Sequence, residues 1–191
     1  MYGPTLTSNG IALRAPAPEE IAILATGWQT NHDIDPYVEN GDRLGSVEGR
    51  IETLGVWRTS ERRIVWLIQR DQDVVGMTNM RDIEWIDRTA TTGMHVYPRF
   101  RRQGIATAVV AMRARYAFAE LGLNKLHTDT WDENVAMKRA LLKAGYREVG
   151  IRRKEFYRGG TWHDMWLGEL LREDWERRQT RDAHPRCGSR I

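Results

Sequence analysis

The sequence predicts an α/β domain in which helices pack on a mixed β-sheet. Two observations favour this class: stretches of alternating or β-branched apolar residues recur along the chain, and segments with helical spacing lie between them. The chain has 191 residues, of which 41% are hydrophobic and 29% are charged. That length suits one well-buried core, so we expect a single domain over residues 1–179 and a polar, flexible tail over 180–191.

The strands of the expected sheet are the stretches with the strongest β character. They cover residues 11–14, 63–69, 74–80, 89–97, 125–130, 147–156 and 161–167. The sequences Arg-Asp-Gln-Asp at 70–73 and Arg-Gly-Gly at 158–160 are typical of hairpin turns.

Two helices are expected between the first and second strands. The first begins near Pro18 and has apolar residues at positions 21, 24 and 28. The second has apolar residues at positions 47, 51 and 54, and Ser46 stands where an N-cap would stand. Both helices follow the first strand, so they are expected to lead into the strand at 63–69.

The clearest helix is expected over residues 104–121. Ile105, Val109, Met112 and Tyr116 form one apolar stripe there, and Arg113 lies off it. A shorter helix over 134–144 is expected to bury Met137, Ala140, Leu141 and Ala144 and to end at Gly145 in the left-handed conformation. A last helix is expected around residues 170–178.

Charge and composition exclude several functional classes. The net charge of +3 comes from arginines that alternate with acids, which indicates a solvated surface rather than a nucleic-acid site. The chain has no apolar run approaching the ~20 residues that cross a bilayer, and it has no secretory signal. With a single cysteine, Cys187, we expect a cytoplasmic monomer or homodimer without a metal site.

The loop before the long helix has the features of an anion site. The strand at 89–97 ends at Pro98, and residues 99–107 (Arg-Phe-Arg-Arg-Gln-Gly-Ile-Ala-Thr) lead directly into the helix. The first turn of a helix has unpaired N–H groups and a partial positive charge, so a pyrophosphate can bind there. Gly104 and Ala106 would let the phosphates approach the backbone, and Arg101 and Arg102 would add charged contacts. A purely structural turn is the alternative.

The motif Arg101-x-x-Gly104-x-Ala106 resembles the acetyl-CoA signature of the GNAT superfamily of N-acetyltransferases, and it stands between a strand and a helix as in that family. Asn134, followed by residues 143–146 (Lys-Ala-Gly-Tyr), resembles a second family segment. The pattern is most similar to the RimJ/RimL-like branch, which acts on ribosomal proteins and small amines. That branch is echoed by Val75-Gly76, Tyr116-Ala117-Phe118, Leu121-Gly122-Leu123, Gly150-Ile151-Arg152 and Asp164 before Leu170-Leu171.

The resemblance, which covers residues 10 to 176, implies a fold and a cofactor. The expected fold is a mostly antiparallel seven-stranded sheet that splays between its fourth and fifth strands, with helices on its sides. The expected cofactor is acetyl-CoA, and Asn134 could instead serve only as a helix N-cap. The residues expected to bind acetyl-CoA are Met94, His95, Val96, Arg101, Arg102, Gln103, Gly104, Ile105, Ala106, Thr107 and Asn134.

The resemblance also implies direct attack of an amine on the thioester, with backbone N–H groups of residues 94–96 stabilising the developing oxyanion. The family's glutamate, serine and tyrosine are absent, because Thr91, Met137 and Leu141 stand in their places. Catalysis by positioning, with water relaying protons, is therefore one alternative. His95 is the first candidate for the base and Glu133 the second, although either could be structural.

The acceptor is expected to be a primary amine, either a protein N-terminus or a small molecule such as a polyamine, an amino acid derivative or an antibiotic. The acidic loop at 31–42, with Asp33 and Asp35, could attract an ammonium group or could simply be solvated. Trp85 and Trp131 are the tryptophans expected near the acceptor. A catalytically weak acyl-CoA-binding or regulatory module is the alternative function.

Overall fold

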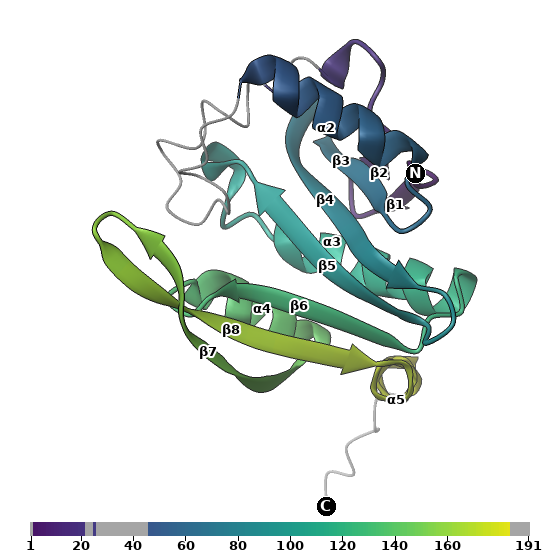
Figure 1. The fold of residues 1–191 in the computed structure, drawn as a ribbon. Helices are drawn as coiled ribbons and strands as arrows, with labels where there is room; N and C mark the ends of the chain where they lie inside the picture. Colours follow the sequence, from purple (N-terminus) through teal and green to yellow (C-terminus); the bar gives the residue numbers. More distant parts are fainter. Residues whose placement is uncertain (1, 22–24, 26–45, 184–191) are drawn as a thin grey trace, which may run out of the picture.

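The computed structural model describes residues 2–21, 25 and 46–183, which form one eight-stranded sheet with helices on both faces (Figure 1). The strands are β1 (Leu6–Ser8), β2 (Ile11–Arg14), β3 (Ile64–Arg70), β4 (Asp73–Glu84), β5 (Thr89–Val96), β6 (Lys125–Trp131), β7 (Arg147–Arg158) and β8 (Thr161–Leu171). The α-helices are α2 (Val47–Thr59), α3 (Ile105–Arg115), α4 (Val135–Ala144) and α5 (Arg172–Ala183).

The sheet is antiparallel except at one place. Its strand order is β1-β2-β3-β4-β5-β6-β8-β7, and only β5 and β6 run parallel to each other. A parallel pair needs a crossover connection, and here α3 makes it between β5 and β6. The predicted mixed, mostly antiparallel sheet is thus confirmed, with one strand more than the seven expected.

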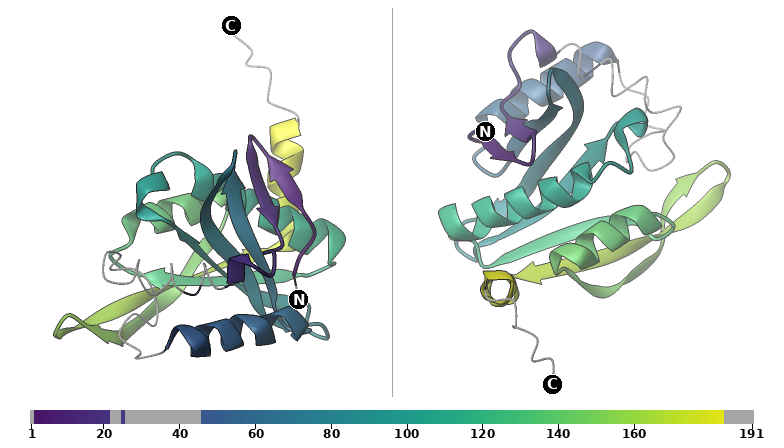
Figure 2. Two further views of the ribbon diagram at one scale, coloured as in Figure 1. Left: turned by 90° about the horizontal axis from the view of Figure 1, so that it is seen from above. Right: turned by 180° about the vertical axis from the view of Figure 1, so that it is seen from behind.

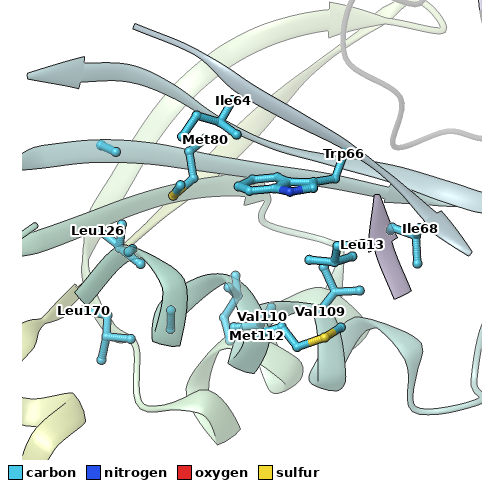
Figure 3. Packing of buried hydrophobic residues seen from close by; sticks show 14 of the residues in the cluster. Leu13, Ile64, Trp66, Ile68, Met80, Val109, Val110, Met112, Leu126 and Leu170 are labelled. Atoms are coloured by element: carbon cyan, nitrogen blue, oxygen red, sulfur yellow. The ribbon is translucent and has the colours of Figure 1, made fainter. Parts of the chain in front are cut away.

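The two faces of the sheet have different covers. Figure 2 shows α3 and α4 on one face and α2 on the other. The main core lies between the sheet and α3, where Trp66, Met80 and Val109 are fully buried (Figure 3). A smaller cluster of Ala25, Leu54 and Leu67 joins α2 to the opposite face. The face covered by α3 therefore contributes most of the buried apolar surface.

Two predicted helix ends are confirmed. Ser46 is the N-cap of α2, and its hydroxyl accepts a hydrogen bond from the N–H of Gly49 at 3.0 Å. Gly145 ends α4 in the left-handed conformation with φ 103°, a backbone geometry that glycine adopts without strain. Ser46 thus fixes where the chain enters α2, and Gly145 fixes where it leaves α4 for β7.

Several predicted boundaries differ from the structure. The additional strand β1 has only three residues, too few for a periodic pattern. Leu170 and Leu171 were expected in the last helix but end β8, and α5 continues to Ala183, past the boundary expected at residue 179. The long helix is α-helical only to Arg115 and then forms one π-helical turn, Tyr116–Glu120. Most of the first expected helix lies outside the described residues.

The two edges of the sheet are irregular. One edge is the short strand β1, and the other is β7. The pairing of β7 with β8 shifts register between Glu148 and Gly150 and again between Arg152 and Phe156. Most residues of β7 are exposed, and Lys154 within it has a φ of 54°.

Trp66 should be among the largest single contributors to stability. It is fully buried, its ring meets Tyr116 edge-on at 5.7 Å, and its Nε1 donates to the carbonyl oxygen of Pro4 at 2.9 Å. Trp66→Ala should lower the free energy of unfolding in urea by about 3–5 kcal/mol. Trp162→Ala is the matched control, because that ring is 55% exposed, and its effect should stay below about 1 kcal/mol. Equal losses in the two variants would contradict this assignment of the core.

Candidate functional site

The parallel strands β5 and β6 separate before they end. Their register runs from Thr89 opposite Lys125 to Thr92 opposite Thr128 and goes no further. Both strands continue, β5 to Val96 and β6 to Trp131, so a gap opens between their carboxyl ends. Figure 1 shows the two strands diverging from their paired ends. The splay expected between the fourth and fifth predicted strands is therefore present.

Backbone groups of β5 face this gap. The N–H of Tyr97 donates to the carbonyl oxygen of Val75 on β4 at 2.9 Å, whereas the carbonyl oxygen of Thr92 accepts from the Thr128 hydroxyl of β6 at 3.2 Å. Backbone polar groups alternate in direction along a strand. Residues 93, 95 and 97 thus point their N–H and C=O groups toward β4, and Met94 and Val96 point theirs toward the gap.

A cavity of about 760 Å³ surrounds the gap and reaches both faces of the sheet. On the side of α3 and α4 it is lined by Phe100, Arg101, Arg102, Gly104, Ile105, Ala106, Thr107, Asn134, Val135, Ala136, Met137 and Ala140. On the side of α2 it is lined by Trp57, Arg63, Met77, Asn79, Arg81, His95, Tyr97, Asp129 and Trp131. Met77 packs on the α2 cluster, which identifies this second face. The gap is the passage between the two halves.

The chain between β5 and α3 is held tightly against the sheet. Residues Pro98–Phe100 form a short 3₁₀ turn, and the Nε of Arg101 donates to the carbonyl oxygen of Val96 at 3.0 Å. Arg102, exposed, has a φ of 62°, and the Oε1 of Gln103 accepts from the guanidinium of Arg70 at 2.6 Å. Arg101 is therefore used to shape the turn, and Arg102 is the guanidinium at its rim.

The first turn of α3 offers backbone donors to the cavity. Gly104 is the N-cap with φ 78° and has no side-chain cap, and the first bond of the helix runs from the N–H of Ala108 to the carbonyl oxygen of Gly104 at 3.2 Å. The N–H groups of Ile105, Ala106 and Thr107 consequently have no acceptor within the helix. A Cβ placed on Gly104 would meet nothing within 4 Å, so the space in front of these donors is open. This arrangement fits a diphosphate.

Asn134 joins the other wall of the same half. Its Oδ1 accepts from the N–H of Met137 at 3.2 Å, and its Nδ2 donates to the hydroxyl of Thr130 at 3.2 Å. It is the N-cap of α4 and also lines the cavity. The two roles considered for Asn134 are therefore compatible, because the cap places the side chain at the cavity wall.

Polar side chains of the α2 half are already engaged with each other. Arg81 holds Asp129 with both carboxylate oxygens within 3.2 Å of one guanidinium nitrogen. His95 meets Tyr97 edge-on at 5.6 Å. Burial raises the pKa of Tyr97, and the charge of Arg99 opposes that shift. Tyr97 is thus a protonated, neutral phenol next to the one histidine among the cavity residues.

Aromatic rings form the far wall of this half. Trp131 stacks on Phe156 with ring centroids 5.4 Å apart and an interplanar angle of 9°, and it contacts His163 at 4.6 Å. His163 in turn binds Glu133 through Nδ1 at 3.1 Å. Glu133 is about half exposed and lies at the cavity edge. Its carboxylate is therefore occupied by a cationic or hydrogen-bonding partner.

Of the four expected acceptor residues, Trp131 lines the cavity, Trp85 does not, and two lie outside the described residues. Trp85 lies in the β4–β5 turn, away from the cavity, where its Nε1 donates to the carbonyl oxygen of Glu61 at 3.1 Å. The turn joins the paired ends of the strands, whereas the gap lies at the opposite ends. Asp33 and Asp35 lie outside the described residues.

Sequence reasoning missed the contribution of α2, of the residue before β3 and of β4 to this half. Trp57, Arg63, Met77, Asn79 and Arg81 line the cavity. A signal was present, because alternation along the strand at 74–80 places residues 77 and 79 on one face. The predicted strand ends at residue 80, whereas β4 continues to Glu84, so Arg81 was not among the expected site residues.

Arg113 is the largest departure from the expected pattern. It was placed off the apolar stripe of α3, but its side chain is fully buried. Its Nη1 donates to the hydroxyl of Thr78 at 2.6 Å and to the carbonyl oxygen of Gly93 at 2.7 Å. Burial lowers the pKa of the guanidinium, and the neighbouring Tyr146 opposes that shift. A guanidinium still stays charged in a protein interior, so a buried cation lies directly beneath the gap.

Within residues 2–21, 25 and 46–183, no helix is long and apolar enough to cross a membrane. In the same described part of the chain, no group of three or more histidine, cysteine, aspartate or glutamate residues is arranged to hold a metal ion.

Comparisons with known proteins agree with this geometry. Residues 11–147 match the family model described as an acetyltransferase (GNAT) domain. An uncharacterized N-acetyltransferase, YoaA of Bacillus subtilis, is 26% identical over 84% of this chain and 93% of its own length. The spermidine N(1)-acetyltransferase of Vibrio cholerae is 24% identical over 56% of this chain and 61% of its own length.

Solved structures have the same fold. A probable acetyltransferase superposes with a TM-score of 0.78 at 24% identity, covering 90% of this chain and 98% of that one. The spermidine N-acetyltransferase of Vibrio cholerae in complex with CoA and spermine superposes with a TM-score of 0.79 at 19% identity, covering 88% of this chain and 99% of that one.

Proposed function

Since the chain belongs to the acetyltransferase (GNAT) domain family and is an N-acetyltransferase that uses acetyl-CoA, we propose that it acetylates the primary amine of a small molecule in the cavity described above. The observation that carries this proposal is the gap between β5 and β6, because it connects the amino terminus of α3 with a second half-cavity on the other face of the sheet.

The α3 half is the proposed cofactor side. The N–H groups of Ile105, Ala106 and Thr107 would bind the diphosphate, with Arg102 at the rim. Arg101 and Gln103 support the turn through their bonds to Val96 and Arg70. Met94 and Val96 would bind the pantetheine amides through backbone groups that face the gap, and Asn134 would lie along the same arm.

The gap itself is the proposed place of reaction. Acetyl-CoA supplies a thioester whose acyl carbon an amine attacks directly. The N–H of Met94 faces the gap and would stabilise the negative charge that develops on the thioester oxygen. Two proton transfers remain, one from the attacking nitrogen and one to the departing sulfur. Tyr97 holds a phenol proton close to the gap and is a candidate donor for the sulfur.

His95 is the proposed base. It lies on the acceptor side of β5 and lines the cavity, and it belongs to the strand that borders the gap. Glu133 is the less favourable candidate, because its carboxylate is paired with His163 and is about half exposed. Asp129 is held by Arg81 in the same way. Because His95 lines the cavity from the strand that borders the gap, it is the group that we place next to the attacking nitrogen.

The α2 half is the proposed acceptor side. Trp57 and Trp131 line it, and flat indole rings stack favourably on cationic amines. Relatives named spermidine N(1)-acetyltransferase support a small amine as the acceptor.

A protein N-terminus is the second candidate, supported by a relative named putative ribosomal N-acetyltransferase YdaF, which is 29% identical over 56% of this chain. That relative also supports placement in the RimJ/RimL-like branch. A cytoplasmic location and the monomeric or dimeric state stay predictions.

The cofactor placement predicts the effect of a charge at the helix start. Gly104→Glu would put a carboxylate where the diphosphate binds, so the Kd for CoA should rise at least ~100-fold. The matched control is Gly160→Glu, because Gly160 has φ 80° and open space around it but lies in the β7–β8 turn. Titration calorimetry should give an unchanged Kd for the control. A folded Gly104→Glu variant that binds CoA normally would show that the diphosphate lies elsewhere.

The assignment of the base predicts a specific loss of turnover. His95→Ala should lower kcat by about 10²–10⁴-fold with little change in the KM for acetyl-CoA. His127→Ala is the control, because His127 is a strand histidine on β6 outside the cavity lining. Thiol release during steady-state turnover measures both variants. If His95→Ala keeps kcat within about threefold of the native value, a factor far below the usual contribution of a general base, proton transfer runs through water instead.

The acceptor class is tested by comparing amines of different size. With saturating acetyl-CoA, kcat/KM for spermidine or another small amine should exceed that for a peptide with a free N-terminus by at least about tenfold, which is a difference of ~1.4 kcal/mol. The reverse order would favour the protein N-terminus. CoA binding without turnover of any amine would favour the acyl-CoA-binding module, which the residues Thr91, Met137 and Leu141 motivate.

A further inference from the structure

Arg113 does not line the cavity, yet it is a charged side chain in the core. It is fully buried, and its Nε and Nη2 have no hydrogen-bond partner among the described residues. The polar groups around it are the hydroxyls of Thr78 and Tyr146 and the carbonyl oxygen of Gly93, with no carboxylate paired to it in the described part of the chain. A buried charge with so few partners opposes folding, so its position suggests a functional reason.

The position of Arg113 relative to the gap provides that reason. Its Nη1 lies 2.7 Å from the carbonyl oxygen of Gly93, the residue that follows the last paired residue of β5. The Thr78 hydroxyl donates to the same oxygen at 2.8 Å. Gly93, the first residue of β5 beyond the pairing with β6, is thus held on its β4 side by a cation and a hydroxyl.

The carbonyl group of Gly93 and the N–H of Met94 belong to one planar peptide unit. In a trans peptide these two groups point in opposite directions. The carbonyl oxygen of Gly93 faces β4 and Arg113, so the N–H of Met94 faces the gap, as the alternation from Thr92 to Tyr97 also requires. A charged donor on the carbonyl oxygen withdraws electrons from the peptide unit and makes its N–H a stronger donor.

We propose that Arg113 is a positioning residue that polarises the Gly93–Met94 peptide, so that the N–H of Met94 binds the thioester oxygen more strongly as charge develops on it. The low-dielectric surroundings of Arg113 strengthen this effect, because little solvent screens its charge. This inference rests on the proposed placement of the thioester beside Met94.

Other polar contacts hold the peptide in register. The Thr92 hydroxyl donates to the carbonyl oxygen of His127 at 3.0 Å and lies 3.3 Å from the hydroxyl of Tyr146. Thr128 donates back to the carbonyl oxygen of Thr92 at 3.2 Å. These contacts fix the last paired residues of β5 and β6, whereas Arg113 fixes the next peptide, the one that enters the gap.

The test uses Arg113→Met, which keeps much of the volume and removes the charge. CoA should bind with a Kd within about twofold of the native value, while kcat should fall at least ~10-fold, less than the 10²–10³-fold loss seen when an oxyanion donor is removed entirely. The unfolding temperature should not fall in proportion, since apolar replacement of a buried charge is often neutral. Arg113→Lys, which keeps a charge near Gly93, should recover part of kcat.

Val110→Ala is the matched control for a general loss of stability. Val110 is buried on the same helix, one turn before Arg113, and does not line the cavity. Its variant should lower the unfolding temperature and leave kcat nearly unchanged. A purely structural role for Arg113 would give the opposite result, with kcat following the unfolding temperature in both variants.

A spectroscopic measurement separates this inference from the proposed acceptor. The infrared band of the thioester carbonyl, observed with carbonyl-labelled acetyl-CoA and no amine, moves to lower frequency as its hydrogen bond strengthens. It should lie lower in the native protein and in Arg113→Lys than in Arg113→Met. An unchanged band in a folded Arg113→Met variant that binds acetyl-CoA would overturn the inference and leave the proposed function intact. Failure of the native protein to bind acetyl-CoA would refute both.

Discussion

The parallel pairing of β5 and β6, and its end at Thr92 and Thr128, is the constraint on which the rest of the site depends. Parallel neighbours require a crossover, and the helix of that crossover must start at the carboxyl edge of the first strand. The amino terminus of α3 is therefore brought to the same edge at which the two strands separate. One topological choice thus places a row of unpaired backbone donors beside an opening in the sheet. No special side chain is needed for either feature, so neither depends on the residues at positions such as Thr91 and Leu141.

The opening has a cost that the surrounding residues offset. Strands that separate leave backbone groups without ladder partners, and buried groups of that kind strongly destabilise a fold. Here the last residues paired between β5 and β6 are held by hydroxyl groups of Thr92, Thr128 and Tyr146, and the Gly93 carbonyl oxygen, on the β4 side of the next peptide, is bound by Thr78 and Arg113. The apolar core around Trp66 and Val109 joins residues from both halves of the sheet on the face covered by α3. The polar contacts are thus concentrated beside the gap between β5 and β6, where hydrophobic packing does not join the two strands.

The helix ends near the site were predictable from the sequence, because residues close to each other in the chain determine them. The glycine at 104 and the basic turn before it mark the helix start, and Ser46 and Gly145 mark caps by their own chemistry.

Other features depend on partners far away in the chain. The burial of Arg113 requires acceptors from β4 and β5, and helical periodicity alone assigns an arginine to solvent. Trp85 was expected near the acceptor, but it lies in the β4–β5 turn, at the ends of the strands opposite the gap. The strand pattern of Leu170 and Leu171 is decided by pairing with β6, which a short apolar run does not reveal.

The outer strands of the sheet carry a different consequence. An open sheet of this kind exposes a row of ladder donors and acceptors at each margin, where another polypeptide could add itself as an extra strand. β1 offers only three residues for such growth, and β7 is kinked twice and is rich in arginine and lysine. Intermolecular strand addition would have to match two displaced registers and bring like charges together. Both edges of the sheet therefore disfavour strand addition and fibrous assembly. The same outer strands make the sheet wide enough to contain a gap at its centre.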